Sequence, residues 1–239
     1  MRQVDLHNRV LSSSLSNEMK VSEDTIRRDL QELADAGRII KVHGGALSRS
    51  FNNFYDNHSP IYSRPGKKII ANKTASLIKD GMFVLTSGGT TIQEMARALP
   101  ADLRATFITG SIPAAIEYMH HPGIDVILIG DKLSKNAKIT VGGDAIARIR
   151  QIRADLCILG INAIDIRHGV TDNDWDVVQV KKAMIESAEK VICVSILEKT
   201  NSYQPIQICT LEEIDILITE SDPDNPILKS YKDAGIRVM

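Results

Sequence analysis

The sequence predicts an α/β protein in two parts, a small helical domain that ends in a β-ribbon and a larger domain built on a mostly parallel sheet. Apolar residues recur at helical spacing early in the chain, as in Ile26, Leu30 and Leu33. Further along, segments that are apolar throughout, such as residues 126–129, alternate with helical patterns, which is typical of strands buried on both faces. At 239 residues, the chain has room for a small domain and a medium one.

The composition is that of a folded globular protein, with 43% hydrophobic residues, 25% charged residues and a net charge of −1. A charge so close to neutral argues against a chain coated in nucleic acid, but it allows a local basic surface. No apolar run reaches the roughly 18 residues that cross a membrane, and the N-terminus lacks a secretion signal pattern. We therefore expect a cytoplasmic protein with no membrane partner.

The three cysteines lie in apolar runs and have no short paired spacing. This pattern is typical of buried thiols in a reducing compartment rather than of metal ligands. We expect neither a metal nor a cofactor in this chain. The three are Cys157, Cys193 and Cys209.

A helix near residues 22–36 has signals at both ends. Ser22 is a good N-cap residue and Gly37 a good stop, while Leu15 and Met19 fit an earlier helix that precedes a turn. The polar side chains off the apolar stripe carry hydroxyl, guanidinium and amide groups, which suit phosphates and base edges in a DNA major groove. With the cap residue, the predicted contacts from this helix are Ser22, Thr25, Arg27, Arg28 and Gln31.

Residues 38–43 alternate like a short strand and lead into Gly44 and Gly45, which favour a tight turn. A helix followed by a small basic ribbon is typical of a winged helix-turn-helix, with Lys41 and His43 on one side of the wing. Residues 1–49 hold eight Lys or Arg against seven Asp or Glu, so we expect binding through a few well-placed groups and through dimerisation. The alternative is an ordinary amphipathic helix with a solvated charged face.

The predicted organisation is a DNA-binding domain over residues 1–48, a linker over 49–63 and a Rossmann-like domain over 64–239. Helices are expected near 65–79, 91–99, 111–119 and 176–189, and strands near 82–86, 105–109, 124–129, 155–161, 191–196, 214–219 and 236–239.

A glycine-rich segment follows the first strand of this larger domain, in Ser87, Gly88, Gly89, Thr90 and Thr91. Glycines let the backbone approach a ligand, hydroxyls donate hydrogen bonds, and the following helix presents free N–H groups. Because ligands bind at the carboxyl ends of parallel strands, we expect a phosphate here. Gly110 and Ser111, after the next strand, form a second loop of the same kind.

These segments resemble the DeoR-type bacterial transcriptional regulators over almost the whole chain. The resemblance is carried by residues 21–30, 41–46, 87–91, 180–185 and 214–219, together with Leu33 and Gly37. It implies a repressor of a sugar or carbohydrate catabolic operon that binds a DNA operator, forms a homodimer or homotetramer and responds to a sugar phosphate. It also implies a sensor domain of the ribose-5-phosphate isomerase/CoA-transferase type, in which Lys199 and the polar position Asn162 contact the effector.

The sequence departs from that family at several ligand-facing positions. Thr86 and Gly110 stand where the family usually has Asp and Asn, Asn162-Ala163 where it has Asp-Gly, and Ile196-Leu197-Glu198 where it has Asp-Ser-Ser. The effector's identity therefore cannot be transferred. These losses also argue against the enzyme alternative, a phosphosugar isomerase, which needs a positioned carboxylate. Asp165, Asp172 and Asp174 lie nearby, and we expect them to be exposed loop residues.

The first helix of the family usually begins further upstream of Val10 than this chain does, so we expect it to be partly truncated. Val4 and Leu6 are its only apolar side chains. A second alternative follows from this: a sensor whose DNA binding is impaired.

Overall fold

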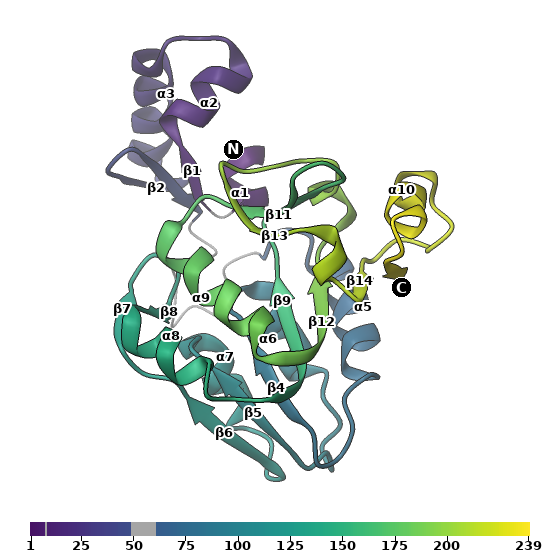
Figure 1. Cartoon of the computed structure of the whole chain (residues 1–239). Helices are drawn as coiled ribbons and strands as arrows, with labels where there is room; N and C mark the ends of the chain where they lie inside the picture. The colour runs from purple at the N-terminus through teal and green to yellow at the C-terminus, as the bar shows by residue number, and fades with distance from the viewer. Residues whose placement is uncertain (8, 49–60) are drawn as a thin grey trace. The chain divides into compact units, whose positions relative to one another are not determined.

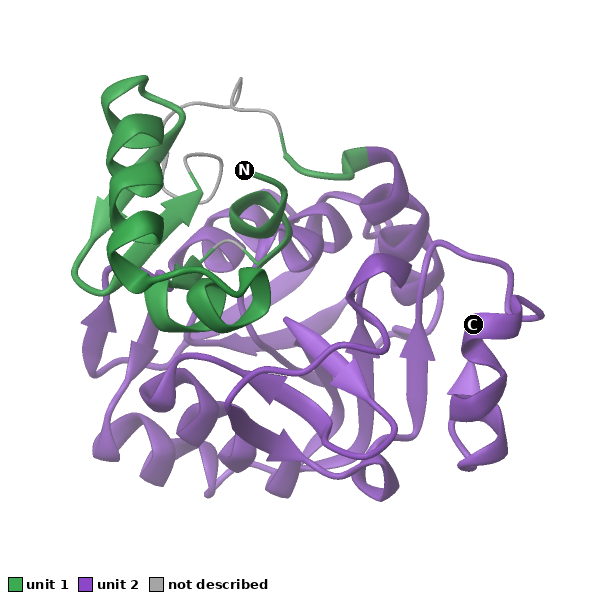
Figure 2. Ribbon diagram, turned by 90° about the horizontal axis from the view of Figure 1, so that it is seen from above, with its two compact units in different colours: residues 1–64 green, residues 65–239 purple. Residues whose placement is uncertain are grey.

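The computed structural model describes residues 1–7, 9–48 and 61–239, and it divides into two compact units, Met1–Arg64 and Pro65–Met239 (Figures 1 and 2). Most of the predicted linker lies in residues 49–60, outside the described residues.

The described residues of the first unit form three helices and a three-stranded antiparallel sheet with the order β1-β3-β2. Its elements are α1 (Arg2–His7), β1 (Arg9–Leu11), α2 (Ser12–Met19), α3 (Glu23–Asp35), β2 (Ile39–Val42) and β3 (Gly45–Ser48). The predicted ribbon is present as β2 and β3. The additional strand β1, which the sequence analysis did not predict, widens it into a sheet.

Helix α3 begins and ends where its local signals predict. The Ser22 hydroxyl accepts a hydrogen bond from the Thr25 amide at 3.1 Å, and Gly37 has a φ of +67° that lets the chain leave the helix. Ile26 and Leu30 are buried in the core of this unit. The helix-turn-helix with its ribbon is therefore confirmed as the N-terminal fold.

Two other expectations for this unit can be compared with the structure. Met19 is 54% exposed, so of the two apolar positions in α2 only Leu15 joins the core, because α2 ends there and Lys20 turns the chain away. Val4 and Leu6 are both buried, and Val4 packs in the same core as Leu15. The short first helix thus contributes to the packing of the unit.

The second unit is built on a seven-stranded parallel sheet with the order β15-β14-β12-β9-β4-β5-β6 (Figure 1). Its strands are β4 (Phe83–Thr86), β5 (Ala105–Thr109), β6 (Ile124–Leu128), β9 (Ala154–Gly160), β12 (Ala188–Val194), β14 (Ile216–Ile218) and β15 (Arg237–Val238). The mostly parallel α/β fold is thereby confirmed. Strands β5 and β6 extend to one side of β4, and β12, β14 and β15 to the other side of β9. The strand order therefore reverses between β4 and β9.

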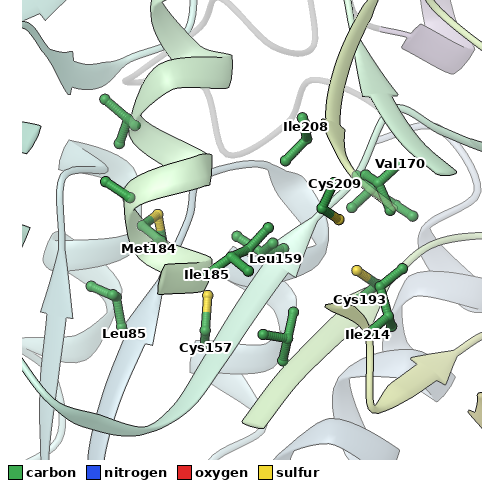
Figure 3. Close-up of a cluster of buried hydrophobic side chains, with 14 of the residues drawn as sticks. Leu85, Cys157, Leu159, Val170, Met184, Ile185, Cys193, Ile208, Cys209 and Ile214 are labelled. Carbon is green, nitrogen blue, oxygen red and sulfur yellow. The ribbon is translucent and has the colours of Figure 1, made fainter. Parts of the chain in front are cut away.

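Helices cover both faces of this sheet. They are α5 (Arg64–Ala75), α6 (Thr90–Arg97), α7 (Ile112–Tyr118), α8 (Gly143–Ile149), α9 (Trp175–Glu186) and α10 (Lys229–Asp233). On one face, the ring of Tyr118 of α7 packs against Phe107 in a tilted arrangement, and its hydroxyl donates a hydrogen bond to Thr86. On the other face Leu85 and Cys157 pack with Met184 of α9 (Figure 3).

The three cysteines are free and buried in this second cluster, as predicted. Burial raises the pKa of all three thiols, and that of Cys209 reaches about 12. At neutral pH they are protonated thiols, so they pack as small apolar side chains.

Several short elements were not predicted. A hairpin of β7 (Lys132–Ser134) and β8 (Ile139–Val141) follows β6, and a three-stranded sheet joins β10 (Ala163–Asp165), β11 (Gly169–Asp172) and β13 (Ile206–Cys209). These strands have only three or four residues each, too few to show a periodicity. They lie beyond the carboxyl ends of β6, β9 and β12 along the chain.

Candidate functional site

The predicted effector residues lie at the carboxyl edge of the parallel sheet, and those after β4 and β9 flank the point where the strand order reverses. Ser87 follows β4 and Asn162 follows β9, and these two strands are neighbours. Ser111 follows β5, and Lys199 lies in a single 3-10 turn, Leu197–Lys199, after β12. All of them therefore come from the carboxyl edge of the sheet, at the position where parallel α/β sheets bind ligands.

The glycine-rich loop is held tightly against the end of β9. The Ser87 hydroxyl accepts a hydrogen bond from the Gly160 amide at 2.9 Å. A Cβ on Gly160 would lie 2.9 Å from the Gly88 carbonyl oxygen, so only glycine permits this approach. Gly89 has a φ of +113°, which an L side chain rarely adopts. The loop thus presents backbone groups at the start of α6. Gly160, which holds the loop in place, was not among the residues predicted from the sequence.

A buried lysine that the sequence analysis did not select joins this loop. Lys67, on α5, is 5% exposed, and its Nζ donates a hydrogen bond to Thr90 Oγ1 at 3.0 Å. Burial lowers the pKa of Lys67 to about 8, against the opposing attraction of Glu94 and Glu220. The first turn of α6 therefore has an ammonium group beside it in addition to its own N–H groups.

Lys199 is a second buried lysine at the same edge. Its Nζ donates a hydrogen bond to the Ile161 carbonyl at 3.3 Å, at the end of β9. Burial, together with the nearby charges of Lys67 and Lys181, lowers the pKa of Lys199 to about 7, although Asp172 and Glu198 act in the opposite direction. The two ammonium groups are thus close enough to repel each other, an arrangement that an anion between them would stabilise.

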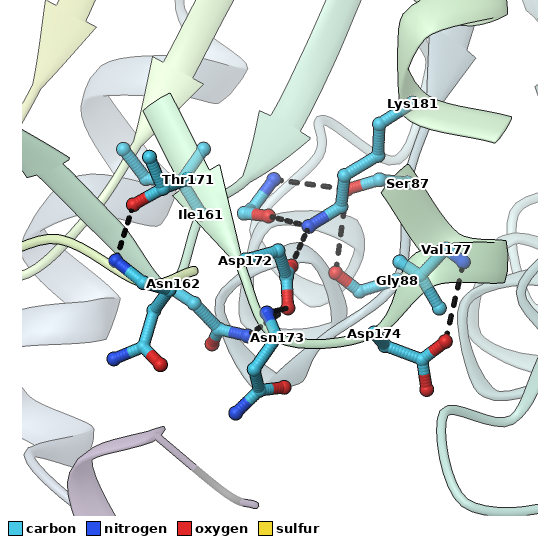
Figure 4. Close-up of polar contacts among 12 residues, drawn as sticks. Ser87, Gly88, Ile161, Asn162, Thr171, Asp172, Asn173, Asp174, Val177 and Lys181 are labelled. Carbon is cyan, nitrogen blue, oxygen red and sulfur yellow. Dashed lines mark hydrogen bonds and ion pairs between the residues drawn. The ribbon is translucent and has the colours of Figure 1, made fainter. Parts of the chain in front are cut away.

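A third lysine closes the site and is neutralised by a carboxylate (Figure 4). Lys181 Nζ donates to Asp172 Oδ2 at 2.9 Å and to the Gly160 carbonyl at 3.1 Å. Asn162 Nδ2 and the Asn173 amide both donate to Asp172 Oδ1 at 2.8 Å. Burial would raise the pKa of Asp172, but the charge and the hydrogen bonds around it outweigh this and lower it.

This network corrects the expectation that Asp172 is an exposed loop residue, because it is 2% exposed. Its two oxygens accept three hydrogen bonds, so it is a fixed anion rather than an available base. The side-chain amide of the predicted effector residue Asn162 donates its hydrogen bond to Asp172. Nothing local in the sequence distinguishes Asp172 and Lys181, since strand β11 and helix α9 place them together.

The remaining predicted loop residues have packing roles in the structure. Ser111 caps α7, accepting a hydrogen bond from the Ala114 amide at 3.4 Å. A Cβ on Gly110 would lie 2.5 Å from Thr140 Oγ1, so glycine there allows β8 to pack closely. Thr91, in the first turn of α6, is half-buried.

In the first unit, the predicted DNA contacts lie on the exposed side of α3. Thr25, Arg27, Arg28 and Gln31 are all exposed, in contrast to Ile26 and Leu30. This set stays a prediction, but its exposure is what contact with a duplex requires.

Three of these side chains, those of Thr25, Arg27 and Gln31, already have partners within the unit, and Thr25 Oγ1 shares a hydrogen bond with Ser22 Oγ at 2.9 Å. Arg27 pairs with Glu23 at 3.3 Å and Asp24 at 3.2 Å, both at the start of α3. Gln31 accepts a hydrogen bond from Lys41 Nζ at 2.8 Å. Arg28 makes no hydrogen bond or ion pair with any described residue.

The predicted wing residues alternate in exposure as expected for a strand and its turn. Lys41 and His43 are exposed, whereas Ile40 and Val42, on the other parity of the strand, are half-buried. The Lys41–Gln31 hydrogen bond ties the wing to α3, so both predicted DNA-binding elements are linked within one unit.

Among the described residues, no helix is long and apolar enough to span a membrane. The same part of the chain holds no group of three or more His, Cys, Asp or Glu side chains placed to bind a metal ion.

The chain matches known proteins over nearly its whole length. Among solved structures, ribose 5 phosphate isomerase A from Neisseria gonorrhoeae matches at a TM-score of 0.41 and 14% identity, over 56% of this chain and 52% of that chain. The chain is 34% identical over 229 residues to the HTH-type transcriptional regulator GlpR of Haloferax volcanii, covering 95% of this chain and 89% of that protein. It is 33% identical over 218 residues to the glycerol-3-phosphate regulon repressor of Haemophilus influenzae, covering 90% and 85%.

Two family models divide the chain between them. Residues 4–51 match the DeoR-like helix-turn-helix domain, and residues 63–221 match the DeoR C terminal sensor domain. The chain belongs to the DeoR family of transcriptional regulators.

Proposed function

We propose that this regulator represses a carbohydrate operon and that a phosphorylated metabolite, bound in the second unit, controls its release from DNA. The observation that carries the proposal is a pair of buried lysines at this edge of the sheet. Lys67 donates a hydrogen bond to Thr90 of the glycine-rich loop, and Lys199, whose pKa the charge of Lys67 helps to lower, donates to the Ile161 carbonyl after β9. The named function of a relative, the glycerol-3-phosphate regulon repressor, supports a phosphorylated effector.

The charges at this edge favour a phosphate group. Lys181 is paired with Asp172, whereas Lys67 and Lys199 contact only a hydroxyl and a carbonyl among their hydrogen-bond partners. A phosphate monoester carries about −1.5 to −2 charges at pH 7, which matches two ammonium groups. The start of α6 adds backbone N–H donors. Ser87, Gly88, Gly89, Thr90 and Thr91 would hold the phosphate, with Lys67 and Lys199 beside them.

The first unit would bind an operator through α3 and its wing. Thr25, Arg28 and Gln31 face solvent on α3, and Lys41 and His43 do so on the wing. A single recognition helix buries too little surface for operator affinity, so we expect a homodimer or homotetramer on paired half-sites. Effector binding would favour a geometry in which the half-sites no longer match.

The enzyme alternative, a phosphosugar isomerase, is not favoured. Such an enzyme needs a carboxylate that can accept a proton from the substrate. The buried carboxylate at this edge, Asp172, has its pKa lowered and accepts hydrogen bonds from Lys181, Asn162 and Asn173. The named functions of the relatives are regulatory.

A panel of sugar and polyol phosphates, each beside its unphosphorylated parent, tests the proposal. Thermal unfolding should shift upwards with at least one phosphorylated compound and not with its parent, because only the folded chain holds the site. The same compound should release a labelled duplex that the protein has selected from a random pool. Turnover of any compound, or duplex binding that no compound alters, would contradict it.

A further inference from the structure

Helix α5 is the element through which the chain passes from the first unit into the second. Arg64, its first residue, closes the first unit, and Pro65 opens the second. The chain that comes from the DNA-binding unit therefore enters the second unit at the first turn of α5.

The two ends of α5 are held in different ways. Lys73, in its last turn, donates to the Thr219 carbonyl at 2.9 Å and the Ser221 carbonyl at 3.2 Å, just beyond β14. Ile70 and Ala71 are fully buried between these ends. Lys67, in the first turn, is held by the Thr90 hydroxyl at the glycine-rich loop. Only this last contact lies at the proposed phosphate site.

The Lys67 contact is one that an anion would strengthen. The Thr90 hydroxyl carries no net charge, so its bond to the ammonium group has one charged partner, whereas a phosphate would add the attraction between two opposite charges. Glu94 and Glu220 attract Lys67 from nearby, but its hydrogen bond is to Thr90. A phosphate on the loop beside Thr90 would be within reach of the same ammonium group. Its arrival would exchange a weak restraint on the first turn of α5 for a strong one.

We propose that Lys67 couples occupancy of the loop at residues 87–91 to the first turn of α5, and through that turn to the DNA-binding unit. The inference rests on the proposed function, since it needs an anion on that loop. Lys67 is thus both a ligand of the phosphate and the residue that transmits its presence.

Hydrogen exchange of the full-length protein, with and without inorganic phosphate, tests this coupling. In the wild type, phosphate should slow exchange both in residues 87–91 and in the first turn of α5, at residues 64–68. Slower exchange in the loop alone would overturn the coupling while leaving the phosphate site intact. If neither segment responds at any phosphate concentration, the phosphate site itself is wrong and both proposals fail.

Two variants and a matched control identify Lys67 as the residue responsible. Lys67→Met should weaken phosphate binding about 10-fold to 100-fold, the loss expected for a buried hydrogen bond to a charged group. At a phosphate concentration that again protects residues 87–91, residues 64–68 should stay unprotected and the duplex should stay bound. Lys67→Gln should behave like Lys67→Met, because it keeps a donor but not the charge.

The control is Lys68→Met, which removes the same charge from the next residue of α5. Lys68 is exposed, so this variant should respond to phosphate as the wild type does. Thermal unfolding shows which variants fold. If Lys67→Met does not fold, the test is made with Lys67→Gln. A folded Lys67 variant with wild-type protection of residues 64–68 and wild-type release of the duplex would overturn the coupling.

Discussion

Lys181 and Asp172 form a buried ion pair, with 2.9 Å between Nζ and Oδ2. The pair joins α9 to the end of β11, and the same ammonium group holds the Gly160 carbonyl at the end of β9. These contacts hold the end of β9, and the Gly160 amide there donates a hydrogen bond to Ser87 of the glycine-rich loop. The pair therefore positions the site, and it leaves Lys67 and Lys199 as the lysines available to an anion.

Breaking this pair should destabilise the second unit. Asp172→Asn leaves Lys181 buried without a counter-charge, so the free energy of unfolding should fall by about 3–5 kcal/mol. Urea unfolding followed by the fluorescence of Trp175, the single tryptophan, measures it. The control is the exposed pair of Arg150 and Glu186, whose charged atoms lie 3.0 Å apart. The variant Glu186→Gln should lower the free energy of unfolding by less than about 1 kcal/mol.

The pH dependence of this pair has a definite sign. Because the pKa of Asp172 is lowered in the folded state, its contribution is complete above the ordinary carboxyl pKa of about 4. It is lost as the pH falls through the lowered pKa. The stability difference between the wild type and Asp172→Asn should therefore shrink only in acid, and a difference that shrinks between pH 6 and 8 would contradict the assignment.

Arg28 should matter for DNA binding. Arg28→Ala removes an exposed guanidinium that makes no ion pair with the described residues, so it should weaken duplex binding by about 1–3 kcal/mol. If Arg28 contacts a phosphate, the slope of log affinity against log salt should also fall by about 1. Anisotropy titrations across a salt series measure both. Arg237→Ala, an exposed arginine of the second unit, is the control, and equal affinities for the two variants would refute the assignment to α3.

Gly160 should be intolerant of substitution. Gly160→Ala places a Cβ 2.9 Å from the Gly88 carbonyl oxygen, so the glycine-rich loop must shift. We expect a stability loss of about 1–3 kcal/mol and at least a roughly tenfold loss of affinity for the phosphorylated compound found by thermal shift. Gly130→Ala is the control, because a Cβ there meets nothing within 4 Å. Calorimetric titration of both variants decides whether the close packing of β9 on the loop supports binding.

Affinity for a phosphorylated effector should fall as the pH rises from 7 to 8. Anion binding needs protonated lysines, and the pKa values of Lys199 and Lys67 are about 7 and about 8. Below a pH of about 6 the phosphate itself takes up a proton and loses part of its negative charge, so binding should weaken there as well. Calorimetry should therefore give the tightest binding between about pH 6 and 7, with proton uptake near pH 7.5. Affinity that is unchanged from pH 6.5 to 8.5 would exclude these lysines as partners.

Local signals made the DNA-binding unit predictable. In α3, the cap Ser22, the apolar stripe and the stop at Gly37 all lie within 16 consecutive residues. The loop at residues 87–91 was equally visible, because its glycines and hydroxyls are adjacent in the chain.

Lys67 and Lys181 could not be found in this way. Lys67 and Thr90 are 23 residues apart, and Lys181 and Gly160 are 21 apart. The two residues of each pair come into contact because of the order of the parallel strands and the face that each helix covers. Asp172 was misjudged for the same reason, since β11 is too short to signal that its last residue is buried.

The measurement that tests the account most directly is release of a labelled duplex by a sugar phosphate, compared with its unphosphorylated parent, in the wild type and in Lys199→Met. We expect the phosphorylated compound alone to release the wild type from the duplex, and Lys199→Met to need at least about tenfold more of it, since a buried charged partner is lost. Equal release by the sugar and its phosphate, or a wild-type response in a folded Lys199→Met, would contradict a phosphate sensor at the edge of the sheet.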